Sequence, residues 1–139
     1  MRTGILTKAN LLVREYAEEV GVPVYIILDA TGSMGYIERK RALSSYVAAA
    51  IAHFALFNSD RVMLILFSGE GVRATRLLQG RNHVHRVLTM ICTAERKGSA
   101  DLKELGVRIR SLLRKRGLIY FITDGFLDGR ELIRIAKLQ

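Results

Sequence analysis

Carboxylates and hydroxyls that could bind a metal ion gather around two short apolar segments of the sequence. Asp29 directly follows the apolar run VYIIL, and Thr31 and Ser33 come after it at alternate positions. Asp124 follows a second apolar run, LIYFIT. Two carboxylates held close together repel unless a cation or a proton lies between them, and hard oxygen ligands suit Mg²⁺ or Mn²⁺. These four residues therefore form a candidate metal site.

The same short stretch also fits a purely structural role. Thr31 or Ser33 could cap a helix that follows, because a hydroxyl at that position accepts a backbone N–H bond. Asp29 could end its strand and accept N–H bonds from the next residues. The long helix predicted after the motif and the second strand-terminal carboxylate, Asp124, favour the metal site.

Strands and helices alternate along the part of the chain that must position these residues. Buried strands are predicted over 24–28, 61–67 and 118–123, because each segment is short, apolar and rich in β-branched residues. Helices are predicted over 36–57, 81–94, 101–116 and 128–139, with a loop over 95–100 and one short antiparallel edge strand over 72–77. We expect an α/β fold with a mostly parallel, doubly wound sheet and helices on both faces.

Some details of these helices can also be predicted. The helix over 36–57 is almost wholly apolar in its second half, so we expect it to lie deep against the sheet. Asn82 is the expected N-cap of the next helix. Gly117 is the expected C′ residue of the helix over 101–116.

Length and composition indicate one domain over residues 1–139, with 1–22 as an N-terminal extension or edge element. The chain is 50% hydrophobic, which is enough for a core, and no apolar run approaches the ~18 residues that span a bilayer. Cys92 is the single cysteine, so no intrachain disulfide can form. We expect a cytoplasmic protein.

The charge balance favours anionic partners. There are 22 Lys and Arg against 13 Asp and Glu, which gives a net charge of +9. The cluster RIRSLLRKR, with Arg76, Arg81 and Arg86 elsewhere, could bind nucleic acid. The cluster has no interleaved aromatic residues and no known nucleic-acid motif, so this remains an alternative function.

The ordered set of segments resembles a von Willebrand factor A domain. YIILDATGSMG resembles the D-x-S/T-x-S segment of that family's metal-ion-dependent adhesion site, and LIYFITDG resembles the later strand that supplies a second Asp. The segments VPVYIILDATGSM, SDRVMLILFSGEGVRATRLLQGRNHVHRVL and RKRGLIYFITDGFLD resemble a prokaryotic branch known as domain of unknown function 58. Its members are often encoded beside MoxR-type AAA+ ATPases.

The resemblance implies a site, a cofactor and a partner. The metal would be Mg²⁺ or Mn²⁺, bound directly by the hydroxyls of Thr31 and Ser33 and largely through water by Asp29 and Asp124. A carboxylate of a protein partner would complete the shell, and that partner could be a MoxR-type ATPase. The implied function is non-enzymatic protein binding.

Two features depart from the family pattern. The family's G-G-T-D-L loop supplies a further hydroxyl, and here Ala100 stands in that place. Ser99 could substitute if the loop shifts by one residue, and Asp101 is nearby. The family also usually continues for one more strand and helix, so we expect a C-terminally truncated domain or one that covers its sheet edge as a homodimer.

An enzymatic alternative uses the same carboxylates. DATGS is close to the DKTGT phosphorylation loop of P-type ATPases, and Asp124 with Asp128 resembles the metal loop of the haloacid dehalogenase superfamily. Asp29 would then be a nucleophile that forms an aspartyl phosphate, with Lys97 or Lys115 neutralising the phosphate. That superfamily normally inserts a β-flap or cap after the nucleophile, whereas this chain enters a long apolar helix.

Overall fold

The computed structural model describes residues 22–32 and 38–123 and has alternating strands and helices. The elements in chain order are β1 (Val24–Asp29), α3 (Glu38–Phe57), β2 (Arg61–Ser68), β3 (Gly71–Ala74), β4 (Leu78–Gln79), the 3₁₀ helix η1 (Arg81–His83), α4 (Val84–Thr93), α5 (Leu102–Leu112) and β5 (Leu118–Ile122). The three apolar runs all form the predicted strands. The predicted helix over 128–139 and the N-terminal element lie outside the described residues.

The sheet is mostly parallel, as the sequence predicted. Its strand order is β3-β2-β1-β5. β4 also pairs with β2, at the start of β2, whereas β3 pairs with the end of β2. β1 pairs in parallel with β2 on one side and with β5 on the other, whereas β3 and β4 pair antiparallel with β2. All residues of β1 are buried because it has a strand on each side and helices on both faces.

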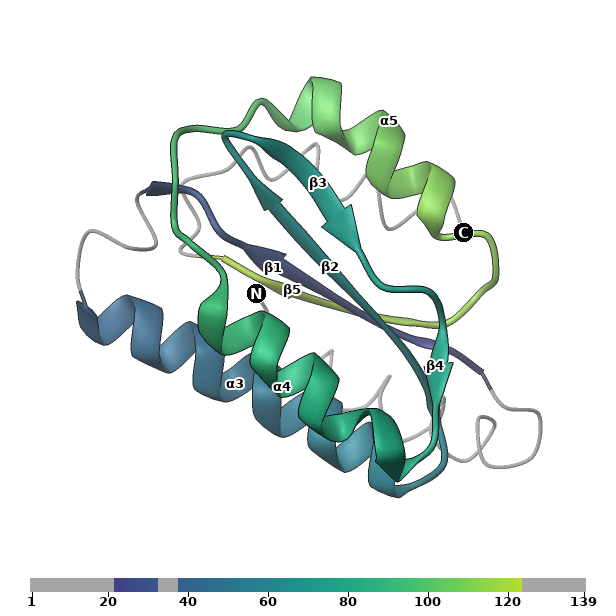
Figure 1. Ribbon diagram of the computed structural model, residues 1–139. Helices are drawn as coiled ribbons and strands as arrows, with labels where there is room; N and C mark the ends of the chain where they lie inside the picture. The colour runs from purple at the N-terminus through teal and green to yellow at the C-terminus, as the bar shows by residue number, and fades with distance from the viewer. Residues whose placement is uncertain (1–21, 33–37, 124–139) are drawn as a thin grey trace, which may run out of the picture.

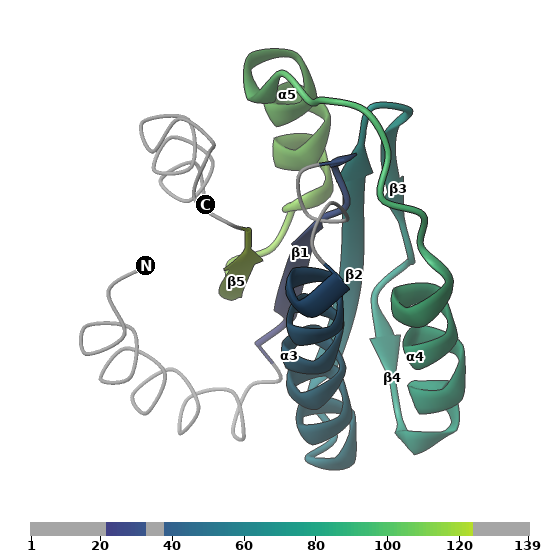
Figure 2. The ribbon, with the colours of Figure 1, turned by 90° about the vertical axis from the view of Figure 1, so that its left-hand side faces the viewer.

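Side chains of β1 alternate between two cores, one on each face of the sheet. Val24, Ile26 and Leu28 pack in the core beneath α3 and α4. Tyr25 and Ile27 point the other way and pack in the core that includes residues of α5. Figure 1 shows α3 and α4 along one face and α5 along the other, and Figure 2 shows α3 and α4 side by side. The prediction of helices on both faces is confirmed.

α3 does not lie as deep as its composition predicted. Its buried residues are mostly small and form one narrow strip: Ser44, Ala48, Ala52, Ala55 and Leu56. Several of its large apolar residues point outward instead, so that Tyr46 is 74% exposed and Phe54 is 61% exposed. The expectation is correct only for the buried strip, whose alanines and Leu56 pack in the core.

The predicted edge strand over 72–77 ends early. β3 stops at Ala74, just before Thr75, and the next strand, β4, begins at Leu78, beyond the predicted range. The Thr75 main-chain N–H donates to the Leu64 carbonyl at 2.9 Å, and the Leu64 N–H donates to the Thr75 hydroxyl at 3.1 Å. A side-chain oxygen thus takes the place of a main-chain acceptor in the ladder. The strand pairing is interrupted at that point and resumes at β4.

Two predicted helix ends are wrong. Asn82 lies within η1, and α4 begins after His83 with no side-chain cap. α5 ends at Leu112, five residues before Gly117. Gly117 is needed instead because a Cβ there would collide with the Pro23 carbonyl, to which the Leu118 N–H donates at 2.9 Å.

None of the helices in the described ranges is long and apolar enough to cross a membrane. We predicted a chain without a membrane span, and this finding agrees with that prediction.

Candidate metal site

The candidate site lies where the carboxyl ends of the parallel strands meet. Asp29 ends β1, Ser68 ends β2, and Thr123 directly follows β5. The chain leaves β1 through α3 on one face, and it reaches β5 after α5 on the other. The β1–β5 boundary is therefore a topological switch point, the usual place for a ligand in an open α/β sheet.

Asp29 is fully buried and accepts hydrogen bonds on both carboxylate oxygens. Oδ1 accepts from the Thr31 main-chain N–H at 2.8 Å and from the Thr31 hydroxyl at 2.6 Å. Oδ2 accepts from the Thr123 hydroxyl at 2.8 Å. Asp29 accepts a nearby N–H, as expected of a residue that ends a strand. It also accepts two threonine hydroxyls, one of them from the residue that follows the neighbouring strand, β5.

This arrangement suits a hard cation. A hydroxyl whose proton points to a carboxylate has its lone pairs directed elsewhere, which is the orientation in which hydroxyl oxygen acts as a ligand. Within the described part of the chain, no Lys or Arg lies within ion-pair distance of the buried Asp29 carboxylate. Among the same described residues, no group of three or more His, Cys, Asp or Glu is placed so that it could hold a metal ion. A cation at this edge would depend on hydroxyl oxygens and one carboxylate.

A loop after α4 crosses the ends of β1 and β2 and fixes their spacing. The Lys97 N–H donates to the Ala30 carbonyl at 3.0 Å, and the Gly32 N–H donates to the Gly98 carbonyl at 2.7 Å. On the other side, the Gly69 N–H donates to the Lys97 carbonyl at 2.8 Å. Gly98 has a φ of +64°, which favours glycine. The main chain of 97–98 thus joins the two strand ends.

The same loop places the candidates for the further ligand. Ser99 is exposed and follows Gly98, whose carbonyl accepts the Gly32 N–H. Ala100 is half-buried and packs against the core on the α5 side. Asp101 is the N-cap of α5, because its carboxylate accepts the Lys103 N–H at 2.9 Å. Ser99 therefore follows a residue bonded to the β1 end, while the Asp101 carboxylate caps α5.

Two of the predicted ligands cannot be placed, and one neighbour was missed. Ser33 and Asp124 lie outside the described residues. Thr123 was not predicted as a site residue, although it bonds directly to Asp29. A hydroxyl at the last position before a strand-terminal Asp was the available signal, since the carboxyl ends of parallel strands meet at one edge.

Residues 7–138 match the family described as "Protein of unknown function DUF58". The chain belongs to this family. No curated protein matches the sequence.

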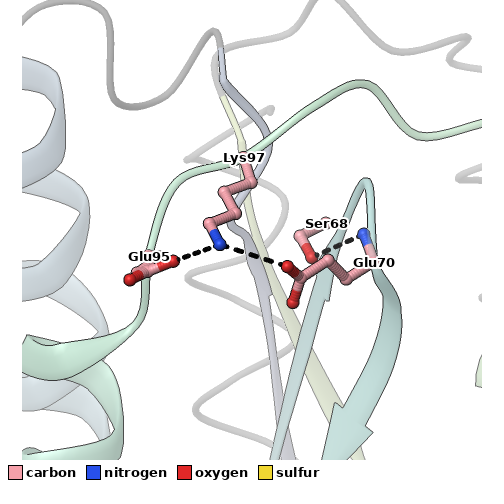
Figure 3. Close-up of polar contacts among 4 residues, drawn as sticks. All are labelled: Ser68, Glu70, Glu95 and Lys97. Atoms are coloured by element: carbon pink, nitrogen blue, oxygen red, sulfur yellow. Dashed lines mark hydrogen bonds and ion pairs between the residues drawn. The ribbon is translucent and has the colours of Figure 1, made fainter.

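A charged rim, formed by Glu70, Glu95 and Lys97, borders the candidate site of this DUF58 domain at the β2–β3 turn. The Lys97 ammonium group lies 2.6 Å from a Glu95 oxygen and 3.2 Å from a Glu70 oxygen (Figure 3). The hydrogen bond from Lys97 lowers the pKa of Glu95, and the bond to Glu95 raises the pKa of Lys97, with Glu70 acting in the same direction. Beside this rim lies a cavity of about 340 Å³, whose lining includes Ala30, Glu70 and Glu95.

The two lysines named for the phosphotransfer alternative lie in unsuitable places in this DUF58 chain. The Lys97 ammonium group is bound by two glutamates on the rim. The main chain of Lys115 bonds to the Tyr25 hydroxyl, near the start of β1, through its carbonyl at 2.7 Å and its N–H at 3.2 Å. Asp29 is four residue steps further along the strand than Tyr25, which is about 13 Å.

Four of the arginines considered for nucleic-acid binding lie on helices at opposite faces of the sheet. Arg81 and Arg86 belong to η1 and α4, which lie on the α3 face. Arg108 and Arg110 belong to α5, which lies on the opposite face. The Arg81 guanidinium also packs over the Phe57 ring at 4.6 Å from its centroid. Arg81 and Arg86 therefore lie on a different face of the sheet from Arg108 and Arg110.

Proposed function

We propose that this DUF58 domain is a non-enzymatic protein-binding module whose partner binds through a Mg²⁺ or Mn²⁺ ion. Asp29 and Thr31 would hold the ion, together with Ser33 and Asp124, which the resemblance to von Willebrand A domains supplies. The observation that carries the proposal is the fully buried Asp29 carboxylate, which accepts hydroxyl bonds from Thr31 at 2.6 Å and Thr123 at 2.8 Å. This edge of the sheet is also the expected ligand position.

Each of these residues would have a separate task. Asp29 orients the Thr31 hydroxyl so that its lone pairs are available to a ligand. The bonds from the 97–98 main chain to Ala30 and Gly32 hold the β1 end in place. When bound, the ion would supply positive charge and an open coordination position for a carboxylate of the partner. The net charge of +9 would steer an acidic partner toward the domain.

We further propose that the partner is a MoxR-type AAA+ ATPase or a protein that it acts on, in the assembly or maturation of other proteins. This part of the proposal rests on the family resemblance and on the basic character of the chain. The cavity beside the charged rim gives a partner's chain room next to Ala30.

We propose that Ser99 supplies a third hydroxyl ligand, in addition to those of Thr31 and Ser33. Ser99 is exposed at the end of the loop that bonds to Gly32, whereas Ala100 carries no oxygen on its side chain and packs into the core. Ser99→Ala is expected to weaken Mn²⁺ binding by about three- to tenfold, and Ala100→Thr is expected to leave it within about twofold. Unchanged affinity in Ser99→Ala would remove Ser99 from the site.

Calorimetric titration with Mg²⁺ and Mn²⁺ tests the site itself. Asp29→Asn keeps the shape of the side chain and removes its charge, so metal binding should be lost. Asp101→Asn is the matched control, because Asn is as good an N-cap as Asp and should preserve both α5 and metal binding. Equal heats in the wild type and Asp29→Asn would refute the proposal.

A further inference from the structure

Arg96 holds a fixed positive charge near the candidate site. It directly precedes Lys97, whose N–H donates to the carbonyl of Ala30, the residue after Asp29. Its Nη1 donates to the Ala94 carbonyl at 2.8 Å. Its Nη2 donates to the hydroxyls of two residues of α3, Ser45 at 2.9 Å and Ser44 at 3.3 Å. These bonds anchor the half-buried guanidinium between the loop and α3.

This charge has no direct counter-ion among the residues that the structure describes. Among the described residues, no carboxylate lies within ion-pair distance of Arg96 and no acceptor bonds to its buried Nε. Burial lowers the pKa of Arg96, and the charge of Arg41 lowers it further. The charge of Asp29 acts in the opposite direction and favours the ionised guanidinium. No hydrogen bond joins Arg96 to Asp29. The two residues lie on neighbouring segments, because the main chain next to Arg96 bonds to the main chain next to Asp29.

A divalent cation at the Asp29 edge would meet the field of this guanidinium. A guanidinium that is partly buried is screened less than one in solvent, so its repulsion of a second cation persists at ordinary salt. The hydrogen bonds to Ser44 and Ser45 limit how far the guanidinium can turn away. Binding the ion therefore carries an electrostatic cost that the site itself imposes.

We propose that Arg96 is a resident cation of the metal site, which keeps the affinity for Mg²⁺ low until a partner's carboxylate arrives. The inference rests on the proposed function. The partner's carboxylate would offset the guanidinium and the metal together, so metal and partner would each strengthen the binding of the other by the same factor. A domain of this kind would carry little metal when alone and become loaded in the complex.

Mn²⁺ affinity in variants at Arg96 tests this inference by calorimetry on the full chain without a partner. Arg96→Met and Arg96→Gln remove the charge, and we expect tighter Mn²⁺ binding by roughly five- to tenfold. Arg96→Lys keeps the charge without the fixed guanidinium bonds and should remain within about twofold of the wild type. Arg86→Met removes an equal charge from the exposed surface of α4 and should also change the affinity by less than about twofold.

The outcomes separate the charge of Arg96 from its structural role. If Arg96 only positions the loop, all three substitutions at this position weaken Mn²⁺ binding, and the inference is overturned. Equal affinity in the wild type, Arg96→Met and Arg96→Gln overturns it as well, while the metal site stands. No binding in any folded variant refutes the metal site, and the inference fails with it. Circular dichroism verifies folding, and the two neutral variants guard against one of them being unstable.

Discussion

Thr31→Val removes the hydroxyl that donates to Asp29 while keeping the shape of a β-branched side chain. The lost bond is short, 2.6 Å, and its acceptor is a carboxylate with no solvent exposure. Hydrogen bonds to charged groups contribute ~1.5–3 kcal/mol to stability. The added methyl group returns roughly 0.8 kcal/mol by burial. The expected net loss is therefore about 1–2 kcal/mol in the free energy of unfolding.

Urea or thermal unfolding in the presence of a chelator measures this loss without any contribution from metal. For a chain of 139 residues, the loss corresponds to a decrease in Tm of roughly 3–8 °C. Thr93→Val is the matched control, because its hydroxyl donates to the Thr89 carbonyl at 2.6 Å on an exposed part of α4. We expect the control to change stability by less than about 0.5 kcal/mol.

The metal proposal adds a second expectation for Thr31→Val. A free Mg²⁺ concentration of about ten times Kd should stabilise the wild type by ~1.4 kcal/mol and should not stabilise the variant. If Thr31→Val is as stable as Thr93→Val in chelator, the Asp29–Thr31 bond does not support the fold as we describe. If Mg²⁺ stabilises Thr31→Val as much as the wild type, Thr31 is not a ligand.

Three further substitutions test the elements around the site. Gly69→Ala should destabilise the fold by about 1–3 kcal/mol in urea unfolding and should weaken Mn²⁺ binding, because the added Cβ would lie 2.8 Å from the Gly98 Cα. A variant as stable as the wild type would contradict this expectation. Tyr25→Phe should cost ~1–2 kcal/mol near neutral pH, because the Tyr25 hydroxyl donates to the Lys115 carbonyl. Burial raises the Tyr25 pKa in the folded state, so this contribution is lost as pH rises through that value, and the stability difference between wild type and variant should shrink at alkaline pH. For Lys97→Met, the Tm difference from the wild type should be small and largest near neutral pH. The pKa of Glu95 is lowered and that of Lys97 is raised, so the stabilisation by the ion pair is lost at acid pH when Glu95 gains a proton and at alkaline pH when Lys97 loses one. A Tm difference independent of pH would refute the ion-pair origin.

The parallel part of the fold could be predicted from local sequence alone. The run VYIIL contains no polar residue, and burial between two strands and two helical layers is the physical reason for that composition. The edge of the sheet was less predictable, since Thr75 interrupts the strand through a side-chain bond to Leu64. That bond depends on a residue 11 positions away, which periodicity does not reveal.

The candidate site also has one part that could be predicted from local sequence and one part that could not. Asp29 and Thr31 are neighbours in sequence, so their hydrogen bond could be anticipated from the motif. Thr123 is separated from Asp29 by 94 positions and is brought there only by the pairing of β1 with β5. The hydrogen bonds from the 97–98 loop to the ends of β1 and β2 could not be predicted either, because they join main-chain atoms and do not depend on particular side chains.

α3 shows the limit of composition as a guide to burial. An apolar helix was expected to be buried, but its buried apolar strip consists of three alanines and Leu56, and Tyr46 and Phe54 are exposed. The helical period identifies one face for the sheet only when the apolar residues are confined to that face. Here they occur around the helix, so the sequence did not distinguish the buried strip from the exposed one.

The central claim is that a divalent cation binds at the end of β1, and anomalous scattering from a crystal grown with Mn²⁺ tests it most directly. The account predicts a peak about 2 Å from the Thr31 hydroxyl oxygen, with Asp29 reaching the ion directly or through water. The peak should be absent from crystals of Asp29→Asn grown in the same way. A wild-type crystal with no peak at this edge of the sheet, or with Mn²⁺ bound only elsewhere, would contradict the account.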